Sequence, residues 1–369
     1  MTQALALKGH AVHLLAPDAI SGEEALEADR DWDALARHYG LRLRFPIEWI
    51  AIRPSWRKYD FAWHAVGRSQ VLEADYLYTR LPQAAALAST RGGRVIFEVH
   101  DAPQGNLGPR IFRFLLGSPQ VLRIVLISEA LKADLSSSFG IGLEPPRTIV
   151  APDGVDLERF KDLPEPPAAR HALNLEAGLS LPETAFTAGY SGHLYAGRGT
   201  SLILELAARL PQVTFLIVGG EPEAVERLKA QAQARNLTNL YLTGFIPNAD
   251  LPRYQAACDF LLMPYQRRVA ASSGGDIARY LSPMKLFEYL ACGRVILSSD
   301  LPVLCEALSP ENAVLLPPED VNAWCEAILA LCAQPEKRTA LARQARQVAQ
   351  GYTWESRAGL VLSGLEGMA

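Results

Sequence analysis

The chain has 369 residues, of which 49% are hydrophobic, 8% aromatic and 21% charged, a composition typical of globular domains that excludes extended disorder. This length predicts about two domains. The formal net charge of −4 provides no general attraction to nucleic acid, so we expect no nucleic-acid partner.

The five cysteines all lie in the second half of the chain, and none of their spacings matches those of zinc modules. We therefore expect reduced thiols, no metal centre and a cytoplasmic location. The longest apolar stretch, residues 111–127, contains Arg113 and Arg123 and is not expected to span a membrane. We also expect no signal peptide, because the chain begins with a segment typical of a helix end.

Short apolar runs recur along the chain between segments with helical spacing. In the first half these runs are residues 11–16, 41–45, 76–80, 94–100, 123–128 and 148–152. In the second half they are residues 186–192, 214–220, 240–245, 260–265, 294–299 and 313–318. Continuous apolar runs are typical of strands buried on both faces. The alternation of strand and helix in each half therefore predicts two parallel, doubly wound α/β units.

The two ends of the amino-terminal unit carry further signals. The chain opens on a helix end followed by a strand, whereas a doubly wound domain normally opens on a strand and a glycine turn. We therefore expect this unit to lack its first strand. A proline-rich stretch, residues 162–183, is predicted to be the seam between the units. An amphipathic segment over residues 352–366 is predicted to form a final helix.

A first candidate site lies in residues 280–293, YLSPMKLFEYLACG. Ser282 is of the N-cap type and Pro283 suits the first helical position, so a helix is predicted to begin here. The free N–H groups of a helix start, together with Lys285, suit a diphosphate. Glu288, one turn further on the same face, could accept hydrogen bonds from ribose hydroxyls. The alternative is a surface helix with an incidental Lys–Glu pair.

A second candidate site lies in residues 190–201, YSGHLYAGRGTS, between a predicted strand and a predicted helix. Gly192, Gly197 and Arg198 nearly match the P-loop pattern, with arginine in place of lysine. Gly199 stands where a P-loop has the Ser or Thr that binds magnesium, which excludes a nucleoside triphosphatase. A glycine-rich turn leading into a helix still favours phosphate, because Arg198 can bind two oxygens at once. A plain turn with an exposed arginine is the alternative.

A third candidate is His100, which with Asp101 ends an apolar strand. Ligands of open α/β sheets bind at the carboxyl ends of strands, so His100 is placed to contact one. A structural histidine is the alternative. The chain contains no G-x-G-x-x-G, which argues against a nicotinamide dehydrogenase.

The stretch of residues 37–68 holds seven basic residues against two acidic ones. Seven aromatic residues are interleaved with them: Tyr39, Phe45, Trp49, Trp56, Tyr59, Phe61 and Trp63. A basic, aromatic surface could bind an anionic lipid interface or stack on sugar rings. The alternative is a solvated basic face whose aromatic side chains lie in the core.

Five segments of the second half together resemble the donor-binding domain of family 4-type glycosyltransferases with the GT-B fold, glycosyl transferases group 1. They are residues 151–160 (APDGVDLERF), 189–220, 242–265, 282–306 and 352–358 (YTWESRA). The first half resembles this family more loosely. The resemblance implies two Rossmann-like domains facing across a cleft. It assigns residues 1–155 and a crossover helix, 352–369, to the acceptor-side domain, and residues 156–351 to the donor-binding domain.

The same resemblance implies transfer of a sugar from a UDP- or GDP-sugar to a glycan, lipid-linked or small-molecule acceptor, with retention of configuration and without a required metal or cofactor. Glu288 would bind the donor ribose, while Arg198 and Lys285 would neutralise the leaving diphosphate. His100 would lie at the transferred sugar. The further donor-binding residues expected are Gly192, His193, Gly197, Gly199, Phe245, Ile246, Ser282, Pro283 and Met284, with Phe245 and Ile246 at the nucleobase.

One departure from the family is that Tyr280 stands where a second glutamate usually precedes Glu288. The S-P-x-K pattern before Glu288 resembles a variant in which the lysine takes over the charge of the site. We expect a role in polysaccharide or lipid-linked glycan assembly, with peripheral contact at the inner face of an anionic membrane. The alternatives are another GT-B enzyme, such as a nucleotide-sugar epimerase or a phosphorylase, and a non-catalytic nucleotide-sugar binding protein.

Overall fold

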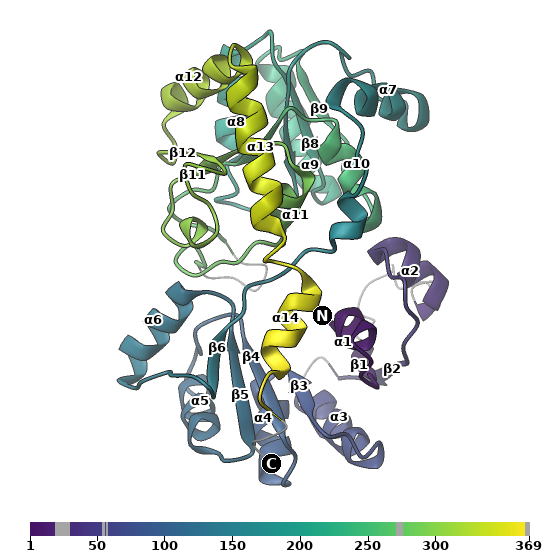
Figure 1. Ribbon diagram of the computed structural model, residues 1–369, viewed down its shortest axis with the longest axis vertical. Helices are drawn as coiled ribbons and strands as arrows, with labels where there is room; N and C mark the ends of the chain where they lie inside the picture. The colour runs from purple at the N-terminus through teal and green to yellow at the C-terminus, as the bar shows by residue number, and fades with distance from the viewer. Residues whose placement is uncertain (19–29, 54–55, 57, 271–275, 366–369) are drawn as a thin grey trace. The chain divides into compact units, whose positions relative to one another are not determined.

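The strands of each sheet pair in parallel, as the sequence predicts, in a computed structural model that describes residues 1–18, 30–53, 56, 58–270 and 276–365 (Figure 1). The chain divides into unit 1, residues 1–36, 41–152 and 354–369, and unit 2, residues 37–40 and 153–353. The predicted seam is wrong. Residues 162–183 instead carry helix α7 (Pro166–Ala177) inside unit 2, because a proline in the first turn starts a helix without costing a hydrogen bond.

Unit 1 contains two sheets in its described residues. The larger has the order β3-β4-β5-β6, with β3 (Leu77–Thr79), β4 (Val95–Val99), β5 (Val121–Leu126) and β6 (Thr148–Val150). The smaller pairs β1 (Leu14–Asp18) with β2 (Ile47–Ala51). The helices are α1 (Thr2–Leu7), α2 (Trp32–Tyr39), α3 (Tyr59–Val71), α4 (Pro82–Thr90), α5 (Gly108–Gly117), α6 (Glu129–Phe139) and α14 (Trp354–Leu362). Every residue of β4 and β5 is buried, as their largely apolar sequences predict, and this includes the charged Glu98 and Arg123.

The strand predicted over residues 41–45 is wrong. Backbone N–H groups of this segment donate to the side chain of Gln3, at 2.5 Å from Arg42 and 3.3 Å from Leu43, so they are not available for a ladder. Phe45 is buried and packs edge-on against Trp32, with ring centroids 5.0 Å apart. The strand that pairs with β1 begins only after this segment, at β2.

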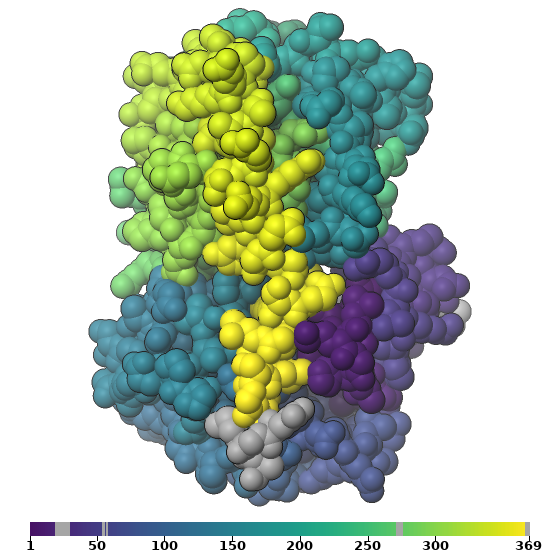
Figure 2. All heavy atoms as spheres, viewed as in Figure 1, coloured from purple at the N-terminus to yellow at the C-terminus, as the bar shows by residue number. Residues whose placement is uncertain are grey.

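The predicted final helix is observed as α14, which belongs to unit 1. Val361 and Leu365 pack in one apolar cluster with Ile96 of β4 and Val125 of β5. Figure 2 shows α14 in yellow beside α1 in dark purple, and the two helices are in contact. The carboxyl-terminal segment is therefore part of the core of unit 1.

Unit 2 is built on a six-stranded sheet with the order β12-β11-β10-β7-β8-β9. Its strands are β7 (Thr187–Ser191), β8 (Thr214–Val218), β9 (Leu240–Leu242), β10 (Phe260–Met263), β11 (Val295–Ser299) and β12 (Val314–Leu316). Its further helices are α8 (Thr200–Arg209), α9 (Pro222–Ala234), α10 (Leu251–Ala256), α11 (Met284–Cys292), α12 (Val321–Cys332) and α13 (Pro335–Ala349), with short 3-10 turns η3 (Leu157–Phe160), η4 (Asn248–Asp250) and η5 (Leu304–Glu306). All six strands predicted for this half are observed. The strand order reverses between β7 and β10, and ligands of doubly wound sheets bind at such a point.

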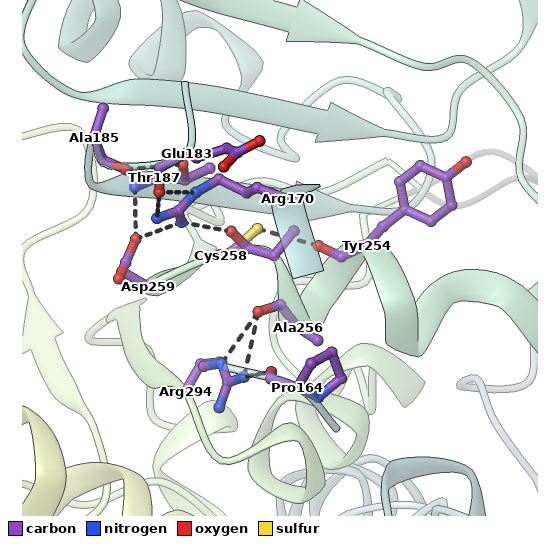
Figure 3. Close-up of polar contacts among 11 residues, drawn as sticks. Pro164, Arg170, Glu183, Ala185, Thr187, Tyr254, Ala256, Cys258, Asp259 and Arg294 are labelled. Carbon is purple, nitrogen blue, oxygen red and sulfur yellow. Dashed lines mark hydrogen bonds and ion pairs between the residues drawn. The ribbon is translucent and has the colours of Figure 1, made fainter. Parts of the chain in front are cut away.

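A buried arginine fixes the two strands at this reversal (Figure 3). Arg170 of α7 pairs with Asp259 at 2.9 Å and donates to the carbonyl of Ala257. The Asp259 carboxylate also accepts the backbone N–H of Thr187, at 2.9 Å. A buried charge is stable only when it is paired, as Arg170 is with Asp259. Because Asp259 also binds the N–H of Thr187, this network holds the start of β7 against the start of β10.

Candidate functional site

A glycine-rich loop leaves the carboxyl end of β7 and leads into α8. Gly197 and Gly199 have φ angles of +83° and +82°, in the left-handed region that favours glycine. A Cβ on Gly197 would lie 2.0 Å from the carbonyl oxygen of Arg268, and one on Gly199 would lie 1.9 Å from that of Pro264. The loop therefore packs its bare backbone against the segment that follows β10, and only glycine fits there.

Helix α11 brings Lys285 to the same loop. A Cβ on Gly192 would lie 2.9 Å from Lys285 Nζ. The N-cap of α11 is Pro283, without a side-chain cap, so the prediction of Ser282 as the cap is wrong by one residue. The reason is that Pro283 has extended backbone angles, φ −79° and ψ 122°, which delay the first helical residue to Met284.

Two tyrosines contact the two predicted cations, Arg198 and Lys285. Arg198 Nη1 donates to the hydroxyl of Tyr265 at 2.9 Å. Lys285 Nζ lies 5.5 Å from the ring centroid of Tyr265 and 3.6 Å from that of Tyr190. Tyr190 belongs to β7 and Tyr265 follows β10, so the cations meet at the point where the strand order reverses. Sequence reasoning missed both tyrosines, whose proximity depends on the sheet order.

Several polar atoms at this point are buried without a hydrogen-bond partner among the described residues. They are Arg198 Nε, Ser282 Oγ, Lys285 Nζ and Gln255 Oε1. Burial and the nearby charge of Arg198 hold the pKa of Lys285 well below its ordinary value, although Glu288 acts in the opposite direction. Three of these atoms, Arg198 Nε, Ser282 Oγ and Lys285 Nζ, can donate hydrogen bonds and are complementary to an anion, whereas Gln255 Oε1 can only accept one.

Glu288 is buried, and its carboxylate accepts a hydrogen bond from Gln255 Nε2 at 3.1 Å. Gln255 also donates to Ser191 Oγ at 3.1 Å, and the N–H of Ser191 donates to the Tyr289 hydroxyl at 2.8 Å. Gln255 therefore ties Glu288 to the carboxyl end of β7. The alternative of an incidental pair on a surface helix is wrong, because α11 turns both Lys285 Nζ and Glu288 inward. No sequence signal singled out Gln255.

Arg159 is a further cation that sequence reasoning missed, although it lies in the motif over residues 151–160. Arg159 Nη1 donates to Asn248 Oδ1 at 2.7 Å. Burial lowers the pKa of Arg159, and the charge of Glu288 partly offsets this effect. Arg159 thus contacts the segment that follows the predicted nucleobase residues, Phe245 and Ile246, and interacts electrostatically with Glu288.

The outer residues of the predicted site lie at the surface of unit 2. Phe245, Met284 and His193 are exposed, and Ile246 is half-buried. His193 stacks on Tyr195, with ring centroids 4.9 Å apart, instead of approaching Lys285. The structure therefore brings Arg198, Lys285 and Glu288 together with the glycines of the loop. The four outer residues just named lie at the surface around this group.

His100 belongs to unit 1, where it follows β4 and hydrogen-bonds through Nε2 to the carboxylate of Glu98. Glu98 is buried, accepts a hydrogen bond from the Tyr78 hydroxyl and forms an ion pair with Arg357 of α14 at 3.0 Å. Burial by itself raises the pKa of Glu98, but the hydrogen bond from His100 and the charge of Arg357 lower it overall. The acidic residue in an otherwise apolar strand was a signal that sequence reasoning did not use.

Two family models match the chain, and together they span most of it. The model of Glycosyl transferases group 1 matches residues 174–348, and that of Glycosyltransferase Family 4 matches residues 1–159. The chain belongs to the family 4-type glycosyltransferases. The family models cover the resembling segments at residues 151–159, 189–220, 242–265 and 282–306.

Among curated glycosyltransferases, the chain is similar to the D-inositol 3-phosphate glycosyltransferases of Xylanimonas cellulosilytica and Saccharomonospora viridis. The first is 27% identical over 254 residues, which are 65% of this chain and 57% of that protein. The second is 26% identical over 263 residues, which are 65% of this chain and 55% of that protein. The matched region thus spans little more than half the length of these relatives.

Two solved structures share the fold over nearly the whole chain. Anabaena Alr3699/HepE, in complex with UDP and glucose, has a TM-score of 0.66 at 18% identity, covering 96% of this chain and 98% of that one. A Rickettsia africae glycosyltransferase has a TM-score of 0.73 at 13% identity, covering 100% and 92%. The expected fold class, GT-B with two Rossmann-like domains, is confirmed. Within the described residues, no three His, Cys, Asp or Glu side chains are grouped as metal ligands.

Proposed function

We propose that this glycosyltransferase moves a sugar from a UDP- or GDP-sugar to a glycan, lipid-linked or small-molecule acceptor with retention of configuration. The observation that carries the proposal is the meeting of Arg198 and Lys285 at Tyr265, beside a glycine-rich turn and with buried nitrogens that have no partner in the described residues. A diphosphate supplies the acceptor oxygens that these groups need.

In the proposed reaction, the bond between the anomeric carbon and the diphosphate oxygen breaks while the acceptor oxygen bonds to the same face of the sugar. The acceptor proton passes to the departing diphosphate. Negative charge grows on the diphosphate as the bond breaks, so Arg198 and Lys285 stabilise the transition state more than the bound donor. No step of the proposal passes through a metal or another cofactor.

We assign the remaining groups by their contacts. The buried Glu288 carboxylate, oriented by Gln255, would accept hydrogen bonds from the donor ribose. His100, oriented by Glu98, would contact the transferred sugar. The exposed Phe245 and the half-buried Ile246 would pack against the nucleobase. A lipid-linked acceptor would place the reaction at the inner face of a membrane.

The test is release of UDP or GDP from a panel of nucleotide sugars, with UDP-glucose first because HepE is solved with that donor. Release that depends on an added acceptor, with a product of retained configuration, supports the proposal. Turnover without an acceptor indicates an epimerase, and turnover that requires phosphate indicates a phosphorylase. Nucleotide binding by calorimetry without any turnover indicates a non-catalytic binding protein.

A further inference from the structure

Three aromatic side chains near the start of α3 lie on the surface of unit 1. Trp56, Tyr59 and Trp63 are 52%, 44% and 58% exposed. The alternative that the aromatic residues of this stretch lie in the core holds for Phe45 and Phe61 but is wrong for these three. Large apolar groups gathered at a surface mark a place of interaction, because exposing them to water is unfavourable.

These three side chains form one wall of a hollow of about 650 Å³. Leu87 of α4 and Ile111 of α5 line it from neighbouring helices. The volume is many times the roughly 30 Å³ that a water molecule occupies in the liquid. A hollow of this size with hydrocarbon and ring walls suits an apolar chain.

Helix α5 continues the apolar surface beyond the hollow. Leu107 and Phe114 stand four residues before and three residues after Ile111, a spacing that places all three on one side of the helix. Leu107 and Phe114 are also largely exposed. We call Trp56, Tyr59, Trp63, Leu107, Ile111 and Phe114 the aromatic surface.

Positive charge surrounds the aromatic surface. The guanidinium of Arg91 lies 4.1 Å from the ring centroid of Trp63, and that of Arg53 lies 5.7 Å from that of Trp56. Further exposed basic residues on the same helices or at their starts are Lys58, Arg110 and Arg113. Asp60 also lines the hollow, but its carboxylate accepts the backbone N–H groups of Arg53, at 2.5 Å, and Phe61, at 2.8 Å. The charge of this region is therefore complementary to anions.

This combination favours a lipid surface over a sugar chain. An arginine lies over each of the two tryptophan rings, which places positive charge directly beside the apolar groups. Tryptophan, tyrosine and arginine together are the side chains that sit at the boundary between headgroups and acyl chains. The apolar hollow also has the chemistry of an acyl chain and not of a hydroxylated ring.

We propose that the aromatic surface docks unit 1 on an anionic membrane, with lipid phosphates at the arginines and an acyl chain in the hollow. The inference rests on the proposed function in one respect, which is that a lipid-linked acceptor would reach the enzyme at this surface. The binding itself needs no sugar transfer. Its failure is therefore distinguishable from failure of the proposed activity.

The test is sedimentation of the full chain, without nucleotide sugar, with vesicles of phosphatidylglycerol and phosphatidylcholine or of phosphatidylcholine alone. We expect binding to the anionic vesicles that weakens with salt and little binding to the neutral ones. Trp63→Ser and Phe114→Ser should each weaken binding by about tenfold, as the loss of one large buried apolar side chain predicts. Leu175→Ser removes an even more exposed apolar side chain from α7 and should leave binding unchanged.

Thermal unfolding and UDP binding, measured on every variant, show that each remains folded. Vesicle binding that is absent in the wild type, or unchanged in both Trp63→Ser and Phe114→Ser, overturns the proposal. An equal loss in Leu175→Ser overturns it as well. Quenching of tryptophan fluorescence by a soluble oligosaccharide, without vesicle binding, would identify the surface as a glycan site and contradict the proposal.

Discussion

The ammonium nitrogen of Lys285 lies 3.6 Å from the ring centroid of Tyr190 and has no hydrogen-bond partner among the described residues. A buried ammonium that contacts aromatic faces without a hydrogen-bond acceptor is poorly compensated for its lost hydration, although the charge of Glu288 partly offsets this loss. The neighbouring Arg198 adds repulsion, which lowers the pKa of Lys285 further. Burying these two charges close together is therefore unfavourable in the free protein, and a bound anion of high charge would stabilise them.

This relationship predicts proton uptake when UDP binds. In the free protein, the pKa of Lys285 lies well below its ordinary value of 10.5, and a bound diphosphate raises it again. Between these values UDP binding must draw a proton onto Lys285, so affinity should fall as the pH rises through this window. Calorimetry over a series of pH values below 10.5, and above the pH of about 6 at which UDP itself ionises, measures the uptake in buffers of different ionisation enthalpy.

The control for this prediction is Lys285→Met, which keeps the apolar stem and removes the titrating group. Its binding heat should be the same in all buffers. If the wild type also shows no dependence on the buffer, Lys285 does not change its protonation on binding. The prediction that a bound diphosphate raises the pKa of Lys285 would then be wrong.

A second prediction concerns the rate of transfer. Arg198→Ala and Lys285→Ala should each lower kcat/KM by about 10²-fold or more, because each removes a charge that we propose to stabilise the leaving diphosphate. Lys229→Ala on α9 is the matched control, since Lys229 is an exposed lysine paired only with Glu226 in the described residues. Steady-state release of UDP measures all three. Rates within twofold of the wild type in both site variants would contradict the assignment.

The elements of this chain were easier to predict than the contacts between them. The strands of unit 2 were all predicted, because a buried parallel strand needs a continuous apolar run that local sequence displays. The strand over residues 41–45 failed because Gln3, far away in sequence, engages its backbone. Arg198 and Lys285 were found through their local motifs. Gln255 and Tyr265 were not, since their roles depend on β7 and β10 being neighbours in the sheet.

A third prediction separates backbone strain from lack of space in the glycine loop. Gly199 and Gly178 both have positive φ angles, 82° and 64°, but a Cβ would meet Pro264 at Gly199 and open space at Gly178. Gly178→Ala should therefore cost about 1 kcal/mol of unfolding free energy, the cost of left-handed backbone alone. Gly199→Ala should cost about 3 kcal/mol or more and abolish UDP binding, because the loop must move away from residues 264–270. Urea unfolding and calorimetry measure both effects, and equal costs for the two variants would show that the close packing does not matter.

A fourth prediction concerns the buried Glu98, whose lowered pKa links its charge to stability. A carboxyl with a folded pKa below its ordinary value of 4.5 stabilises the protein above that value, and this contribution is lost as the pH falls through the folded pKa. Glu98→Gln also leaves the buried Arg357 without its charge partner, so it should lower the unfolding free energy near pH 7 by about 3 kcal/mol. The difference from the wild type should shrink below pH 4.5.

Urea unfolding over a pH series measures this difference, with Glu226→Gln, an exposed glutamate on α9, as the control that should remain within about 0.5 kcal/mol. The same variant tests whether Glu98 positions His100, because an amide can still accept one hydrogen bond from the imidazole but carries no charge. We expect kcat to fall while the KM for the nucleotide sugar changes little, since the groups proposed to contact the diphosphate belong to unit 2. A fall in stability with unchanged kcat would show that Glu98 holds α14 in place through Arg357 and does not position His100 for the reaction.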